Sequence, residues 1–580
     1  MSKKYGINNI KELFLAILPA QIFSFIVSSL SGIVNGIVIG KYLTSLDMVA
    51  LGFAVPVTQI MTVCSTIVAS GSRILCGRFI GRGERDKVNE TFTSSIYLLL
   101  IIGIVITLVG LLGSDLIAKI IASSEAINST SSYIKGLSIG ILPTIITPCL
   151  MVFLQMNNDN NYALLSTLVL AVSNLLLALL SMNYVSADIF TIGVATSISQ
   201  YLVLLFIIVR FIKVKTLPRM CRCENNLYLN ILRIGLPSAL ANLLYAFRNS
   251  ILNTFASNLY SIDAVNALSI MNSSCGPFDA VNIGLGQTVL MLASIYIGEK
   301  DNDSLKALFK TSIKIGLVLG FAKIIIIYFL SGALADYYGA SVVVKGLTID
   351  LYRAYSLSMP LNMITVSLMN IYQSFGKITY CNILLLLTAL LFPVAFAYLL
   401  FGLIGISSIW HCYWASEAFI LLVMYVFICS KKKKLITSIN DLIIIDNVND
   451  IGSHITITVN SFEEITDVSK KIQDYCLSEN IDKKRSYIAG LCCDEIATNI
   501  VEHGFSKTKK KNKFIDIYCD VEDNKVIIRI KDNCVAFDPH IKLNNNDDAT
   551  TNIGIKMVSK LAISMNYQNT FGLNVLSIEL

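Results

Sequence analysis

The chain has 580 residues, of which 54% are hydrophobic and 15% are charged, and its formal net charge is +7. Its mean hydropathy of +0.66 excludes an ordinary soluble protein, because so much apolar material cannot be buried in a water-soluble fold of this length. The composition therefore indicates a membrane protein in contact with a lipid bilayer, and we expect no nucleic-acid partner.

Apolar blocks follow one another along the first three quarters of the chain, each near the ~20 residues that cross the hydrocarbon core of a bilayer. We predict twelve spans, at residues 13–37, 47–72, 91–113, 133–155, 163–182, 188–211, 230–257, 265–294, 312–333, 350–372, 379–401 and 403–429. After Ser430 the pattern changes to alternating charged, β-branched and turn residues, which is typical of a soluble α/β domain. The boundary is expected at residues 431–434.

The orientation follows from basic loops after the second, sixth and twelfth spans. These loops contain Arg73, Arg78, Arg82, Arg85, Lys87, Lys213, Lys215, Arg219, Arg222 and the run 431–434. Because basic loops stay on the cytoplasmic side, we predict a multi-pass protein of the cell (plasma) membrane with cytoplasmic N- and C-termini. The opening MSKKYGINNIKEL lacks a short apolar core with a cleavage site, so the first span is expected to be retained.

The apolar part repeats itself at an offset of 216 to 218 residues. Pro19 matches Pro237, and IGRGERDKVNETF (80–92) matches IGEKDNDSLKALF (297–309). An internal duplication is the simplest explanation. Six spans per copy predict two lobes, at 1–217 and 218–434, related by a pseudo-two-fold axis along the membrane normal, as in transporters whose lobes rock about a midplane site.

The apolar part also resembles multidrug and toxic compound extrusion (MATE) transporters. The resemblance is carried by LAILPAQIFSFIVSSLSGIVNGIVIGKYLTSLDMVALGFAVP with GSRILCGRFIGRGE, and by LRIGLPSALANLLYAF with GLGQ. It covers about residues 8–430 and implies a polytopic α-helical antiporter of twelve spans. Such an antiporter exports small organic compounds, often cationic, in exchange for Na⁺ or H⁺.

Many members of that family carry an acidic coupling residue in the first span, and the matching position here is Asn35. Its carbonyl oxygen can ligate Na⁺, but an amide cannot take up a proton. The equivalent residue of the second copy, Asn253, favours an alternative in which both amides serve helix packing.

Three ionisable residues within the spans break the duplication. They are Arg248, Asp279 and Glu417, which stand opposite Leu30, Thr62 and Ser199 of the first copy. A charge in hydrocarbon is costly, so each is expected to face a cavity or a partner. Arg248 and Asp279 are expected to pair, for structure or for transport, and Arg248 also permits an anionic substrate. Glu417 is the predicted H⁺ or Na⁺ carboxylate, or a residue at headgroup level if its span is shifted.

The soluble tail, at 453–580, follows a linker at 435–452. We predict strands at 454–459, 513–520, 525–531, 564–568 and 573–579, and helices at 462–478, 483–503 and 553–562. This pattern favours an α/β sandwich of about the smallest usual domain size.

The stretch GLCCDEIATNIVEHGF (490–505) places Glu495, Asn499 and His503 at four-residue spacing, hence on one face of a helix. A carboxylate and an amide one turn apart suit a general base beside a Mg²⁺ ligand. Asp532 ends a strand and can accept an adenine amino group, and Gly554 opens a helix whose first amides can bind phosphates.

This order of residues, followed by DNCVAFDP and NIGIKMVSKLAISMNYQNTFGLNVLSIEL, resembles the GHKL-type (histidine-kinase-like) ATPases, specifically the anti-sigma-factor serine kinases. The resemblance implies bound Mg²⁺-ATP. It makes Glu495 the catalytic base, Asn499 the Mg²⁺ ligand, His503 part of the same motif, Asp532 the adenine ligand and Gly554 part of a glycine motif. Cys534, Thr551 and Asn552 stand where glycines are usual, so side chains narrow the nucleotide site. The alternative is a module that binds a partner without hydrolysis.

Two functions therefore remain open. In the first, a cation-coupled exporter carries a cytosolic ATP-binding domain that regulates it or relays its state to a cytosolic protein partner. In the second, the transporter-like part senses a compound and the tail acts as a serine/threonine-protein kinase. The sequence contains no GxxxxGK[ST] loop, which argues against transport driven by ATP hydrolysis.

Overall fold

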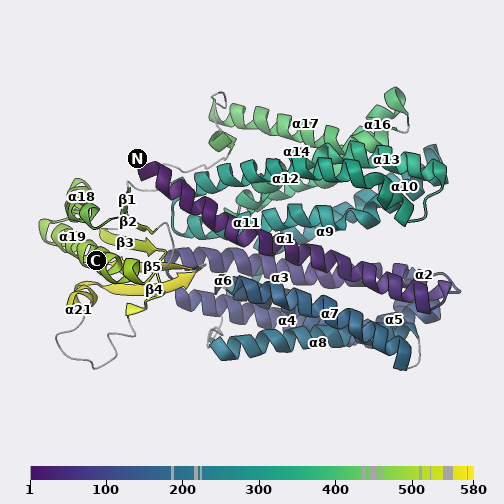
Figure 1. Ribbon diagram of the computed structural model, residues 1–580, viewed down its shortest axis with the longest axis horizontal. Helices are drawn as coiled ribbons and strands as arrows, with labels where there is room; N and C mark the ends of the chain where they lie inside the picture. Colours follow the sequence, from purple (N-terminus) through teal and green to yellow (C-terminus); the bar gives the residue numbers. More distant parts are fainter. Residues whose placement is uncertain are drawn as a thin grey trace.

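The computed structural model consists of a long helical part with a small sheet domain at one end (Figure 1). It describes residues 2–157, 159–184, 188–214, 220–221, 225–405, 407–433, 435, 439–442, 454–459, 461–508, 513–522, 524–539, 553–570 and 572–580. The end of the helical part that meets the sheet domain is called the tail end below. Most of the predicted linker lies outside the described residues.

The helical part has two halves. The first contains α1 (Ser2–Tyr42), α2 (Ser45–Phe53), α3 (Val55–Arg82), α4 (Arg85–Ile121), α5 (Ile127–Ser138), α6 (Ile141–Met156), α7 (Asn160–Tyr184) and α8 (Ile189–Val214). The second contains α9 (Asn225–Leu259), α10 (Ile262–Ser274), α11 (Gly276–Gly298), α12 (Asn302–Tyr337), α13 (Val342–Ser356), α14 (Ser358–Ser374), α15 (Ile378–Leu386), the π-helical turn η1 (Leu387–Leu391), α16 (Phe392–Ile404) and α17 (Ser407–Lys432). A 3₁₀ turn, η2 (Ile439–Leu442), follows.

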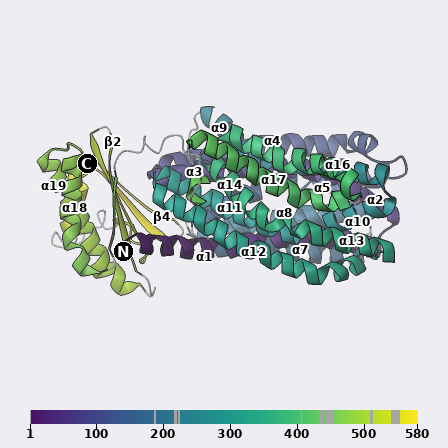
Figure 2. The same ribbon diagram turned by 90° about the horizontal axis from the view of Figure 1, so that it is seen from above.

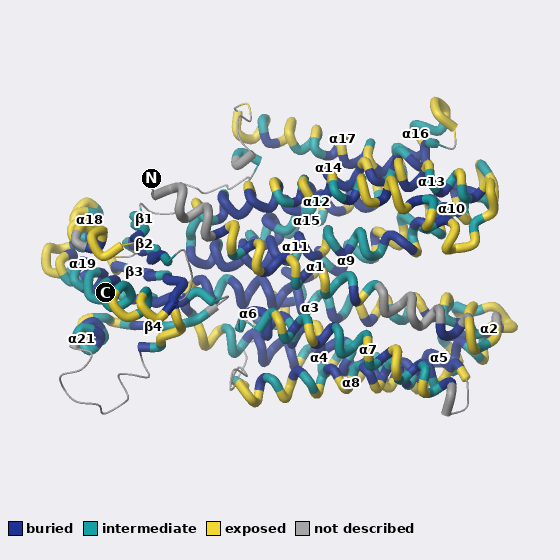
Figure 3. Tube along the Cα trace, in the orientation of Figure 1, coloured by how far each residue is buried: buried dark blue, intermediate teal, exposed yellow. Residues whose placement is uncertain are grey.

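Within the described residues, ten helices are long and apolar enough to cross a membrane. The number rises to eleven if Ile127–Ser138 and Ile141–Met156, which are bent by 48° relative to each other, form one span. Many positions on the outside of these helices are exposed (Figure 3). Large apolar residues are among them, and Leu112 and Phe329 are 84% and 77% exposed. Such a surface suits lipid, and the prediction of a polytopic helical membrane protein is confirmed. The division into twelve spans stays a prediction.

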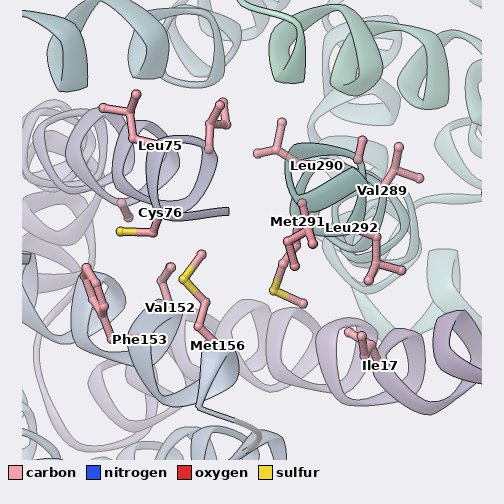
Figure 4. Packing of buried hydrophobic residues seen from close by; sticks show 14 of the residues in the cluster. Ile17, Leu75, Cys76, Val152, Phe153, Met156, Val289, Leu290, Met291 and Leu292 are labelled. Carbon is pink, nitrogen blue, oxygen red and sulfur yellow. The ribbon is translucent and has the colours of Figure 1, made fainter. Parts of the chain in front are cut away.

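The two halves pack tightly against each other toward the tail end. A Cβ atom on Gly71 of α3 would overlap the carbonyl oxygen of Ile231 on α9, and one on Gly235 of α9 would overlap that of Ile67. Apolar side chains of α1, α3, α6 and α11 pack together in one core (Figure 4), to which Ile231 and Ile234 of α9 also belong. The backbones can approach this closely only because glycine has no side chain.

The sheet domain is a two-layer α/β unit. Its antiparallel strands, β1 (His454–Val459), β2 (Ile515–Glu522), β3 (Lys525–Asp532), β4 (Ser564–Thr570) and β5 (Leu573–Glu579), lie in the order β1-β2-β3-β5-β4. One face is covered by α18 (Thr466–Ser478), α19 (Lys483–Asn499) and α21 (Ile553–Leu561), with short turns η4 (Phe462–Glu464) and η5 (Ile500–Phe505). The other face is turned toward the helical part (Figure 2). The predicted strands and helices are confirmed to within a few residues.

Successive side chains along each strand point to opposite faces of the sheet, so the two faces carry different residues. On β3, Ile528 and Ile530 are buried against the helix layer, whereas Arg529 and Lys531 form contacts with the helical part. Asp532 has the parity of Ile528 and Ile530, so its carboxylate lies on the helix side of the sheet.

Candidate functional site

The tail site begins on α19. Asp482 caps this helix, because its carboxylate accepts the backbone N–H of Arg485 at 3.0 Å. Cys492, Cys493, Ile496 and Ala497 bury one side of the helix in the domain core. Glu495 and Asn499 are left half-buried at the edge of that core. The Asn499 side-chain nitrogen donates to the Glu495 carbonyl oxygen at 2.8 Å, so the amide oxygen is the group that Asn499 can offer a cation.

Gly554, in the first turn of α21, meets both of these residues. A Cβ atom on Gly554 would overlap Oε2 of Glu495 and would lie 3.6 Å from the side-chain nitrogen of Asn499. The structure therefore brings together Glu495, Asn499 and the beginning of a helix, where unpaired backbone amides favour an anion. Thr551 and Asn552, just before this helix, lie outside the described residues.

Asp532 ends β3 and is only 5% exposed. Its Oδ1 atom accepts the backbone N–H of Cys534 and the side-chain N–H of Asn574, each at 2.8 Å. Asn574 lies directly opposite Asp532 in the β3–β5 register, so the partner strand holds the carboxylate in one orientation. Sequence reasoning missed Asn574, although its place opposite a strand-end aspartate is a usable signal.

His503 lies one element further along the chain. The α-helix ends at Asn499 and continues as the π-helical turn η5, in which His503 is exposed. Glu495 and Asn499 are half-buried, whereas His503 is exposed to solvent, so its part in the site stays a prediction. Cys534 fills space beside the same turn, because a Cβ atom on Gly504 would lie 3.1 Å from its sulfur.

The residues present fit Mg²⁺-ATP. Asn499 offers an amide oxygen for Mg²⁺, α21 begins with backbone amides suited to phosphates, and Asp532 offers a fixed carboxylate for adenine. Glu495 stands next to Asn499 and Gly554, where a base would face a bound phosphate chain.

A second polar group lies within the membrane helices and centres on Glu417 of α17, which is 8% exposed. Its Oε1 accepts the side-chain N–H of Asn362 at 2.7 Å, and its Oε2 accepts the Thr365 hydroxyl at 2.8 Å. Both partners come from α14. Because both carboxylate oxygens have polar neighbours, Glu417 lies inside the helix bundle. Asn362 and Thr365 were not among the residues predicted from the sequence.

Arg248 does not form the expected ion pair with Asp279. Its guanidinium lies over the rings of Tyr245 and Tyr413, 5.0 and 5.1 Å from their centroids, and donates to Asn249 at 3.3 Å. Asp279 instead accepts the Tyr355 hydroxyl at 3.1 Å. The Tyr355 and Tyr413 rings meet edge to face at 5.1 Å, so aromatic side chains connect the two charges.

Lys323 of α12 is a further charged residue of this region. It is 3% exposed, and its ammonium group donates to the Asn282 side-chain oxygen on α11 at 2.5 Å. Lys323 is not among the residues predicted from the sequence. The available signal was a lysine inside the apolar run IGLVLGFAKIIIIYFL, opposite Ile106 of the first copy. Asn35 lies in α1, and its side chain is outside the described part of the structure.

Comparison with known families divides the chain in two. The MatE family matches residues 20–180 and 237–399, which together are more than half of the chain. The second segment begins 217 residues after the first, as the predicted duplication requires. Residues 460–580 match the histidine kinase-like ATPase domain.

Individual relatives agree with this division. The chain is 23% identical over 397 residues to multidrug export protein MepA of Staphylococcus saprophyticus, covering 67% of this chain and 87% of that protein. It is 22% identical over 333 residues to the probable multidrug resistance protein YoeA of Bacillus subtilis, covering 55% and 72%. A crystal structure of MATE in complex with MaD3S superposes with a TM-score of 0.68 at 20% identity, covering 75% of this chain and 97% of that one.

The resemblance to MATE transporters and to a histidine-kinase-like ATPase is thus confirmed, whereas the likeness to anti-sigma-factor kinases stays a prediction. The chain belongs to the MatE family of membrane transporters, and its residues 460–580 form a histidine kinase-like ATPase domain.

Proposed function

We propose that the protein is a secondary exporter of small organic compounds, driven by Na⁺ or H⁺ across the cell membrane. Twelve spans form two six-span lobes, and both termini and the ATPase domain are cytoplasmic. Membership of the MatE family supports this proposal, as does the similarity to MepA, a multidrug export protein, and to YoeA, a probable multidrug resistance protein. The basic residues of α3 near the tail end support the orientation.

The coupling role is carried by one observation, the buried carboxylate of Glu417 between the Asn362 amide and the Thr365 hydroxyl. A proton on Glu417 would remove a charge from the bundle, and Na⁺ would find oxygen atoms on all three side chains, which hard cations prefer. Arg248, Asp279 and Lys323 lie in the same half and would contact or repel the substrate according to its charge.

Replacement of the coupling carboxylate tests this role. In proteoliposomes with an imposed Na⁺ or H⁺ gradient, we expect Glu417→Gln to reduce export of a fluorescent organic cation to the rate of protein-free vesicles. The neutral amide keeps the size of the side chain but can neither release a proton nor neutralise Na⁺. Asp336→Asn is the control, because Asp336 pairs with Lys345 at an exposed position. Gradient-driven export by Glu417→Gln at the wild-type rate would refute the assignment.

We further propose that the ATPase domain binds Mg²⁺-ATP and regulates the exporter or relays its state to a cytosolic protein, for example by serine phosphorylation. Bound Mg²⁺-ATP would supply a polarised phosphate chain. Asn499 would position the metal ion, Asp532 would select adenine, and Glu495 would accept a proton from an attacking hydroxyl or water. The meeting of Glu495, Asn499 and Gly554 supports this assignment.

Titration of the purified full-length protein with Mg²⁺-ATP tests nucleotide binding. We expect Asp532→Ala to weaken binding by ~10- to 100-fold, since a hydrogen bond to a charged group contributes ~1.5–3 kcal/mol. Asn499→Ala should weaken Mg²⁺-ATP binding to the level that the wild type shows with EDTA. Lys525→Ala, at an exposed pair with Glu579, should bind as the wild type does. A wild-type protein that binds no nucleotide would contradict the ATP-sensor and kinase functions together and leave the exporter standing.

A further inference from the structure

The polar face of the sheet is buried against the helical part. Tyr518 of β2 and Arg529 of β3 are only 8% and 6% exposed, although both lie on the face away from the domain's own helices. The Arg529 guanidinium lies 5.2 Å from the centre of the Tyr518 ring. These charged and aromatic side chains are shielded from solvent, so the sheet forms a packed interface with the helical part. Figure 2 shows the sheet facing the helical part at this point.

The interface holds the second half of the helical part through Glu299, directly after α11. The Lys531 ammonium group donates to the Glu299 carboxylate, and Arg529 donates to its backbone carbonyl. Glu299 is 3% exposed, and Lys531 also lies 5.4 Å from the centre of the Tyr296 ring. Burial lowers the pKa of Lys531, but the charges of Glu299 and Asp301 outweigh it and raise that pKa, so the lysine stays protonated.

The same sheet holds the first half through the end of α3. Gln568 of β4 donates from its side-chain nitrogen to the carbonyl oxygen of Ile80. Gly83, which follows α3, lies so close to the sheet that a Cβ atom on it would be 3.5 Å from the Ser577 hydroxyl. Strand β3 therefore contacts one half, and β5 and β4, the next two strands of the sheet, contact the other.

The ends of α3 and α11, which the sheet contacts, are equivalent segments of the duplication, and these two segments also touch each other. Gly81 and Gly298 match at an offset of 217 residues. A Cβ atom on Gly298 would overlap the carbonyl oxygen of Arg78, and one on Gly81 would lie 2.8 Å from the Glu299 nitrogen. The tail end is therefore closed. Strands β3, β5 and β4 are hydrogen-bonded to one another, so the distance between them is fixed. They cannot stay in contact with both halves if the two halves move apart at this end.

We propose that the sheet domain is an intramolecular clamp, which binds the equivalent ends of both halves and keeps the tail end closed. Opening of this end requires the domain to release Glu299 on one side or Ile80 and Gly83 on the other. The inference rests on the proposed function in one respect, that transport opens the tail end. It does not depend on nucleotide binding or on the identity of the substrate.

The distance between the halves tests the clamp. Fluorophores introduced as unnatural amino acids at Lys87 of α4 and Lys306 of α12, near the tail end with side chains 55% and 37% exposed, report opening of full-length protein in nanodiscs. We expect Glu299→Lys to raise the ratio of open to closed molecules by ~30-fold or more, because it leaves Lys531 facing a like charge in a buried site. Glu299→Lys with Lys531→Glu should restore the closed population.

Arg82→Glu is the matched control, because Arg82 is the equivalent of Glu299 in the first half, is about half exposed and pairs with Glu84. It should leave the distance unchanged. Should Glu299→Lys not fold, Gln568→Ala loosens the other side of the clamp and should raise the open ratio ~2- to 10-fold, the effect of one ordinary hydrogen bond.

The outcomes separate the clamp from the exporter. A Lys87–Lys306 distance that Glu299→Lys and Gln568→Ala both leave unchanged overturns the clamp, even if the wild type exports. Failure of the charge swap to restore closure overturns the role of the Glu299–Lys531 pair. A distance that responds to the variants in a protein without measurable export supports the clamp and refutes the exporter instead.

Discussion

Glycine at position 554 is explained by its neighbour. The glycine backbone of α21 lies against Oε2 of Glu495, so the space that a methyl group would occupy is taken by the carboxylate. Resemblance to GHKL ATPases predicted a glycine for phosphate binding, and the packing adds a second reason. Asn499 lies at the edge of the same contact, so any displacement of α21 alters both residues.

We expect Gly554→Ala to weaken Mg²⁺-ATP binding by about tenfold or more, because an added methyl group in a filled site costs ~1–3 kcal/mol. The methyl group would push Glu495 away or lift the start of α21. Lys560→Ala, near the other end of the same helix, is the control. Nucleotide titration measures both variants, and wild-type affinity in Gly554→Ala would show that the carboxylate can move aside freely.

Neighbouring residues of β3 serve the two faces of the sheet. Asp532 points to the candidate nucleotide site, and Lys531 binds Glu299 on the transporter. Because adjacent residues of a strand point to opposite faces, Asp532, the proposed adenine ligand, and Lys531, which contacts the transporter part, are separated by only one peptide unit. A strand displaced by bound nucleotide would therefore displace the clamp as well.

At the scale of elements, small residues of α3 determine how closely the halves meet. Gly71 approaches α9, and Gly77 approaches Ser294 of α11 so closely that a Cβ atom would lie 2.7 Å from the serine Cβ. Gly81 repeats the contact nearer the sheet domain. Gly77 and Gly81, one turn apart, thus face α11, while Gly71 faces α9.

Gly71→Ala should therefore destabilise the closed tail end by ~1–3 kcal/mol, since its methyl group would collide with the backbone of Ile231. The fluorophore pair at Lys87 and Lys306 should report a larger open population, and the thermal midpoint of the purified protein should fall. Gly346→Ala in α13 is the control, because nothing lies within 4 Å of its added Cβ. Equal behaviour of the two variants would contradict a role of this crossing in closure.

At the scale of the whole molecule, the ATPase domain lies against the tail end of the helical part, which the proposed transport cycle would open. Its sheet spans the ends of α3 and α11, and its helix layer with the nucleotide candidates faces away from the membrane part (Figure 2). The candidate nucleotide residues thus lie on the side of the sheet away from the contact with the transporter part. A domain tethered only by its linker would have no such influence on the lobes.

The sequence by itself determined the class of the protein and the elements of its tail. Apolar blocks of membrane length and the change of pattern after Ser430 are local signals, and so are the alternating strands and the helix that carries Glu495 and Asn499. Each of these depends on residues that are close together in the chain. The repeat at a constant offset adds the relation between the halves, because it too can be read from the sequence alone.

Only the tertiary structure decided which groups meet across the chain. Glu417 meets Asn362 and Thr365 across 55 and 52 residues, and Lys531 meets Glu299 across 232. Arg248 faces tyrosine rings instead of Asp279. Which side chains meet inside the bundle depends on how the helices pack, and the order of the helices along the chain does not determine it. Such contacts depend on side-chain packing between distant elements, which no local pattern records.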